Sequence, residues 1–151
     1  MGTYSFLNVQ ATLSGPGGNI SLGNGSGAAE EGISIEMIED KDAMVTGADG
    51  QIMHSLRAGN AARASVRLLK TSPVNAMLSA MYNFQRQSSV NWGQNTLVVS
   101  DTVRGDVQSF DTLAFGKQPG VTYSKDANMN EWTFYGNLNQ LLGTGVPDVN
   151  I

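Results

Sequence analysis

Alternation of apolar and polar side chains with a period of two is the feature that most constrains what this chain folds into. Residues 7–13 read Leu-Asn-Val-Gln-Ala-Thr-Leu, and the segment extends back to Tyr4. Because successive side chains of a strand point to opposite faces, the pattern predicts a half-buried strand over residues 4–13. Turn-forming residues, such as Ser-Gly-Pro-Gly-Gly at 14–18, separate this strand from the next. Further strands are predicted at residues 19–22, 33–38, 64–71, 95–100, 107–116, 121–123 and 131–138.

One segment has a helical period instead. Ser72 suits an N-cap and Pro73 suits the first helical position, so a single helix is predicted over residues 73–87. Seven or eight strands with one helix predict a mainly β fold, a β-sandwich or barrel with the helix packed on it. The apolar stripe of the predicted helix consists of Val74, Met77, Leu78, Met81, Tyr82 and Gln85.

The length of 151 residues predicts a single domain over residues 1–151. Between residues 40 and 63 the apolar residues thin out and no period is sustained, which predicts a long connector loop. Such a loop inside a compact domain is usually functional or ordered by a partner. Residues 143–151 begin Gly-Thr-Gly-Val-Pro and are predicted to form a flexible tail.

The residues that enzymes and metal sites require are sparse. The chain has no cysteine, and its one histidine, His54, lies in the predicted connector. The glycine-rich segments 15–18 and 23–27 do not lead from a strand into a helix and lack the Lys-Ser/Thr of a phosphate-binding loop. No nucleophile elbow is present. We therefore expect a protein that is not an enzyme and has no cofactor or metal. No apolar stretch has the length of a membrane span, so no membrane association is expected.

The charges are unevenly distributed. The net charge is −4, which argues against a tight grip on nucleic-acid phosphates. Acidic residues dominate from Glu30 to Asp49, whereas the charges that follow between Arg57 and Lys70 are all basic. Two interpretations remain open: the blocks pair within one subunit or face water, or acidic and basic ends meet in a head-to-tail contact between subunits.

Several short segments resemble one family, the tail tube proteins of contractile-tailed bacteriophages, which share their plan with the tubes of type VI secretion systems and contractile bacteriocins. The resemblance extends from residue 1 to about Gly145. Its most distinctive parts are Leu-Leu-Lys-Thr-Ser-Pro at 68–73 and Asn-Glu-Trp at 130–132. The other matching segments are Met-Gly-Thr-Tyr-Ser-Phe at 1–6, Asn-Val at 8–9, Ser-Gly-Pro-Gly-Gly at 14–18, Glu-Glu-Gly-Ile at 30–33 and Val-Asn at 74–75.

The resemblance implies a virion structural subunit that assembles in the host cytoplasm. Hexameric rings would stack into a tube inside a contractile sheath, with inner strands joined around a lumen that conducts DNA during genome ejection. The implied partners are further copies of the chain, the tail sheath protein, the baseplate and the tail terminator. Residues 43–62 would then reach the neighbouring ring. The candidate inter-subunit contacts are Glu39, Asp40 and Asp42 of one subunit against Arg57 or Arg63 of another.

Two alternatives remain open at this stage. A tube-terminating or baseplate-adjacent paralogue would share the fold without polymerising. A small β-sandwich carbohydrate-binding module would use Trp92 or Trp132 as a stacking platform, although Trp132 and Phe134 share one face of a predicted strand, which favours a core position for both.

Overall fold

The computed structural model describes residues 9–22, 28–120, 122–125 and 129–143. The prediction of a mainly β fold with one helix is confirmed. The elements, in chain order, are β1 (Val9–Gly15), β2 (Gly18–Ser21), β3 (Ala28–Met37), β4 (Asp42–Thr46), β5 (Ile52–Leu56), β6 (Ala61–Leu69), α1 (Val74–Arg86), β7 (Asn95–Asp101), β8 (Asp106–Lys117) and β9 (Met129–Leu141).

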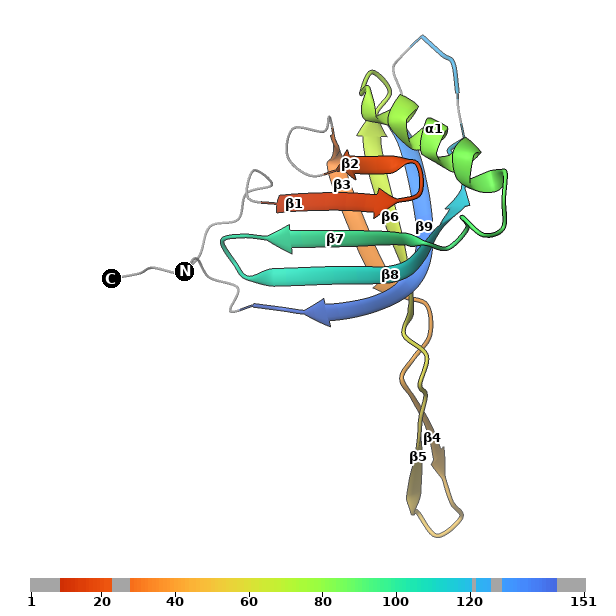
Figure 1. Ribbon diagram of the computed structural model, residues 1–151. Helices are drawn as coiled ribbons and strands as arrows, with labels where there is room; N and C mark the ends of the chain where they lie inside the picture. The colour runs from red at the N-terminus through yellow and green to blue at the C-terminus, as the bar shows by residue number, and fades with distance from the viewer. Residues whose placement is uncertain (1–8, 23–27, 121, 126–128, 144–151) are drawn as a thin grey trace.

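Seven of the strands form one antiparallel sheet in the order β2-β1-β7-β8-β9-β6-β3, and β4 and β5 form a separate two-stranded sheet. Figure 1 shows the large sheet folded over itself, with β1, β2 and β7 on one side and β3 and β6 on the other. The long strands β8 and β9 curve between the two sides. The folded sheet encloses the apolar core, which the alternating apolar residues of its strands supply.

The bend of β8 has a local cause. Thr112 has a φ of 46°, and the pairing with β9 shifts its register between Asp111 and Ala114, so the strand carries a β-bulge. Gly136 lies opposite the bulge, where a Cβ atom would come within 3.0 Å of the carbonyl oxygen of Asp111 and 2.9 Å of Leu113 Cδ1. The strands can approach this closely only because position 136 has no side chain.

Aromatic rings occupy the centre of the core. The ring centroid of Phe115 lies 4.9 Å from that of Phe134 and 5.5 Å from that of Tyr82. Trp132 is 2% exposed and donates its indole N–H to Asn75 Oδ1 at 3.1 Å. Trp132 is therefore a core residue, as the shared strand face favoured, and it offers no exposed ring for stacking.

The helix matches its prediction to within one residue at each end. Pro73 occupies the N-cap position rather than the first helical turn, and the Oγ of Ser72 accepts a hydrogen bond from the backbone N–H of Val74 at 3.3 Å. Leu78 and Met81 are buried, but Met77 is exposed, so the buried stripe is narrower than the sequence predicted. Figure 1 places α1 at one end of the folded sheet.

A buried pair of amides holds the helix to the sheet. Gln85 Nε2 donates to Asn95 Oδ1 at 2.7 Å, and Asn95 Nδ2 donates to Gln85 Oε1 at 2.9 Å. Gln85 Nε2 also donates to the carbonyl oxygen of Pro16 at 2.9 Å, in the turn between β1 and β2. A Cβ atom at Gly15 would lie 1.9 Å from Asn95 Oδ1, so the amide pair requires glycine beside it. Two buried positions of the core are thus polar, and their side chains satisfy each other's hydrogen bonds.

Two further sequence predictions are wrong. The segment 40–63, predicted as a connector loop, contains the hairpin β4–β5, and β6 already begins at Ala61. The segment 121–123 was predicted as a strand, but Thr122 and Tyr123 belong to none, and Val121 lies outside the described residues. The first part of the strand predicted at 4–13 and most of the predicted tail, residues 4–8 and 144–151, also lie outside the described residues.

Candidate functional site

The hairpin β4–β5 extends away from the folded sheet, at the end opposite α1 (Figure 1). Its strands pair from Asp42 opposite Leu56 to Thr46 opposite Ile52. The turn is closed by a hydrogen bond from the N–H of Gly47 to the carbonyl oxygen of Gln51 at 2.7 Å. Five residues per strand correspond to a length of about 17 Å. We call residues 42–56 the arm.

The root of the arm continues the ladder between β3 and β6. The N–H of Ile38 donates to the carbonyl oxygen of Ala61 at 3.1 Å, and that of Arg57 donates to the carbonyl oxygen of Lys41 at 2.8 Å. The ammonium of Lys41 donates to the carbonyl oxygen of Gly59 at 2.7 Å and also to Asn60 Oδ1. These bonds connect the two segments that form the root, residues 38–41 and 57–61, so the arm leaves the sheet in a defined direction.

The arm exposes apolar side chains on both of its faces. Leu56, at its base, is 87% exposed. An isolated two-stranded hairpin is marginally stable in water, and a cluster of exposed apolar side chains commonly marks an interaction surface. The arm therefore has the properties of a segment that is stabilised by contact with another chain. The other large apolar residues exposed on it are Met44, Val45, Ile52 and Met53.

The predicted contact residues divide into two groups. Asp42 Oδ2 lies 2.6 Å from His54 Nδ1 within the arm, and Arg63 pairs with Glu36 across β3 and β6. Glu39, Asp40 and Arg57 are exposed near the root, and none of these three makes an ion pair within the described part of the chain. The structure thus brings Arg63 to an acidic residue of its own subunit.

One part of the sheet has two open edges. Among the described residues, β3 pairs only with β6 and so forms one edge. The pairing of β7 with β8 ends at Asn95 opposite Leu113, whereas β8 continues along β9 as far as Lys117. The last residues of β8, from Ala114 onward, therefore form a second open edge. Between the two edges lie β9 and β6, and we call this four-stranded unit the β8–β3 sheet.

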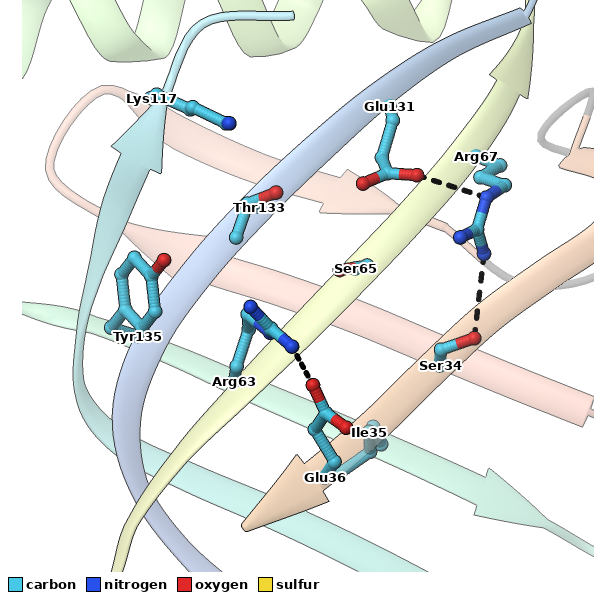
Figure 2. A pocket seen from close by; sticks show the side chains of 10 residues that line it. All are labelled: Ser34, Ile35, Glu36, Arg63, Ser65, Arg67, Lys117, Glu131, Thr133 and Tyr135. Atoms are coloured by element: carbon cyan, nitrogen blue, oxygen red, sulfur yellow. Dashed lines mark hydrogen bonds and ion pairs between the residues drawn. The ribbon is translucent and has the colours of Figure 1, made fainter. Parts of the chain in front are cut away.

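The face of the β8–β3 sheet that points away from the core is polar and charged (Figure 2). Arg67 Nε lies 2.9 Å from Glu131 Oε2, and Arg67 also donates to Ser34 Oγ at 3.4 Å. The pair of Arg63 and Glu36 lies beside it. A groove of about 420 Å³ is lined by Ser34, Ile35, Glu36, Arg63, Ser65, Arg67, Lys117, Glu131, Thr133 and Tyr135.

Sequence reasoning missed both ion pairs and the hairpin. Glu131 lies directly opposite Arg67 in the β6–β9 register, and Glu36 lies opposite Arg63 in the β3–β6 register. No local sequence pattern predicts which residues of these strands pair, because the paired strands are far apart in the sequence. The hairpin had one usable signal, Asp49-Gly50, since such a pair between two strands is typical of a tight turn.

Within the described ranges, no group of three or more His, Cys, Asp or Glu side chains is placed to hold a metal ion. Nor does the described part of the chain contain a helix long and apolar enough to cross a membrane.

Comparison with known proteins identifies relatives among phage structural proteins. A family model described as "Bacteriophage PhiTE tail tube protein" matches residues 1–143. The "Structural protein ORF10" of Pseudomonas phage KPP10 is 26% identical over 108 residues, which cover 71% of this chain and 62% of that relative. The match thus spans less than two thirds of the relative's length.

Solved structures with a similar fold come from contractile injection systems. A chain from the sheath/tube terminator of the extracellular contractile injection system PVC has a TM-score of 0.54 at 11% identity, with 92% of this chain and 96% of that chain covered. A chain from the PVC sheath-tube complex has a TM-score of 0.50 at 9% identity, covering 88% of each. A chain from the anti-feeding prophage baseplate has a TM-score of 0.51 at 10% identity, with 93% of this chain and 96% of that chain covered. At these identities the likeness is one of fold.

Proposed function

Because this chain belongs to the bacteriophage PhiTE tail tube protein family, we propose that it forms hexameric rings that stack into a tail tube whose lumen conducts DNA. As a member of that family it is a structural component of the phage tail. The observation that carries the proposal is the arm, which projects from the folded sheet and exposes apolar side chains on both faces. An isolated subunit gains nothing from such a segment, whereas a subunit in a stack buries it.

Ring closure uses the two open edges of the β8–β3 sheet. Strands β8, β9, β6 and β3 are successively antiparallel, so β8 and β3 run in opposite directions. When the β3 edge of one subunit meets the β8 edge of the next, the new pair is antiparallel as well. Unpaired backbone groups at both edges then find partners, and repetition around a ring removes the edges altogether.

Stacking uses the arm. The arm continues the direction of β3 and β6, and barrel strands are inclined to the barrel axis by only about 35–45°. The arm therefore leaves the ring largely along its axis and reaches the neighbouring ring. Glu39, Asp40 and Asp42 at its root and base are the acidic contacts of this interface, and Arg57 is their basic counterpart. Because Arg63 is paired with Glu36 of its own subunit, it contributes less than Arg57 to the contact between rings.

The remaining parts of the proposal rest on the family. The tube lies inside a contractile sheath and ends at a baseplate and a terminator, with assembly in the host cytoplasm before incorporation into the virion. The structural neighbours include chains from a sheath-tube complex, a tube terminator and a baseplate, which supports this set of partners. Because a terminator also has this fold, a terminating or baseplate-adjacent role is the second candidate, and polymerisation distinguishes it from a tube subunit.

Electron microscopy of the purified chain tests the proposal. We expect hollow tubes or six-fold rings; a chain that stays monomeric at high concentration would refute the tube function. In an arm-deletion variant, a short Gly-Ser link replaces residues 42–56 and joins Lys41 to Arg57, which are already bonded through their backbones. Rings without stacks are expected. The replacement stops before Ala62, which is buried in the core, so the thermal melting of the subunit should be retained.

A further inference from the structure

On the polar face of the β8–β3 sheet, each of the two arginines forms an ion pair with a glutamate of the same subunit. Arg67 contacts both Glu131 and Ser34, on the strands that flank β6, and Arg63 contacts Glu36. Figure 2 shows the two guanidinium groups turned toward these partners across the groove. Guanidinium groups are the strongest phosphate-binding side chains, because their planar N–H donors match oxyanions in pairs.

The position of this face in a closed ring follows from where the rest of the subunit lies. The opposite face of the β8–β3 sheet packs on the core, and beyond the core lie β1, β2, β7 and α1. A ring has more room outside its barrel than inside, so this bulk occupies the outer side. The polar face, with its charges and hydroxyl groups, then lines the lumen.

On the basis of the proposed tube function, we propose that Glu36 and Glu131 are neutralising residues of the lumen wall: they occupy Arg63 and Arg67 and so prevent these arginines from binding the phosphates of DNA. A conduit for DNA requires weak contacts, since each lysine or arginine that neutralises a phosphate releases counterions and adds affinity. Lys117 is the third cation of the groove, and it makes no ion pair within the described ranges. The wild-type wall thus offers Lys117 as a cation without an ion pair in the described ranges, whereas the glutamate variant also removes the carboxylates that hold Arg63 and Arg67.

The test uses Glu36→Gln/Glu131→Gln tubes, incubated with a short fluorescent double-stranded DNA and then pelleted. Wild-type tubes should leave most of the DNA in the supernatant, and the affinity of the variant for the DNA should be at least tenfold higher at 50 mM salt. The slope of log affinity against log salt changes by about −0.9 for each phosphate contact that is gained. Between 50 and 200 mM salt, one additional contact therefore corresponds to about a 3.5-fold further loss of affinity and two contacts to about a twelvefold loss. Adding Arg63→Gln/Arg67→Gln to the variant should restore the wild-type distribution.

The matched control is Asp106→Asn, which removes one charge outside both the groove and the arm and is compared with each single glutamate variant. The Asp106 carboxylate accepts a hydrogen bond from the backbone N–H of Gly143 through Oδ1, and asparagine retains that acceptor. If the control pellets as much DNA as the single glutamate variants, or if the double glutamate variant pellets no more than wild type, the proposal is overturned while the tube function stands.

Assembly is scored separately by electron microscopy. If the glutamate variant fails to assemble, fluorescence anisotropy of the same DNA with unassembled variant and control chains gives the comparison instead, with tighter binding expected for the glutamate variant alone. If wild-type chains form no tubes, the tube function fails, and equal anisotropy for variant and control would overturn the neutralising role as well.

Discussion

Leu56→Ser separates assembly from folding more sharply than any other single change in the arm. The side chain is 87% exposed in the subunit, so only about an eighth of its burial is achieved within one chain. Full burial of a leucine contributes about 1.5–3 kcal/mol. The subunit should therefore lose only about 0.2–0.4 kcal/mol of its free energy of unfolding, which is within the range of neutral surface substitutions.

The effect on stacking is much larger. If a neighbouring ring covers the exposed part of Leu56, the substitution removes about 1.3–2.6 kcal/mol from each arm contact, or about 10- to 80-fold in affinity. Rings make this contact once per subunit, so the losses accumulate around the ring. We expect tubes to shorten or disappear while the melting temperature of the subunit is unchanged.

The assay compares pelleting and electron microscopy of tubes with thermal melting of unassembled chains. Val90→Ser is the matched control, because Val90 is 78% exposed in the loop after the helix and lies outside the arm. The reasoning would be refuted by Leu56→Ser tubes of normal length, or by an equal loss of tubes in the Val90 variant. A large drop in melting temperature would show that Leu56 supports the fold of the subunit instead.

Two further predictions concern the fold. Gln85→Leu leaves the buried amide of Asn95 without its partner, so urea unfolding should show a loss of about 2–4 kcal/mol; Asn95→Leu in the same chain should recover part of it, and strictly additive losses would contradict the pairing. Gly136→Ala forces a Cβ atom against Leu113 and should cost about 1–3 kcal/mol, whereas Gly120→Ala, where the space is open, should leave the melting curve unchanged. Equal effects at the two glycines would show that the approach of β8 to β9 is not the constraint.

The sequence by itself determined the elements that have one buried face. Strand alternation and the helical stripe appear wherever a core removes one side of an element from water, so β6, β7, β8, β9 and α1 were predicted close to their observed bounds. The strand predicted at 4–13 overlaps β1, although its first residues, 4–8, lie outside the described residues. The same signal explains the main failure. The arm is exposed on both faces, burial selects neither of them, and residues 40–63 consequently show no period.

Only the tertiary structure determined which charged residues pair with one another. An acidic block followed by a basic block is compatible with contacts within a subunit or between subunits, and the β3–β6 register selects the first for Arg63. The pair of Arg67 and Glu131 depends on strands more than sixty residues apart, which lie side by side only because β9 inserts between β8 and β6. Hydrophobic patterning specifies which face of a strand is buried, but it does not specify which strand becomes its neighbour, and that neighbour determines the partner of every charge on the open face.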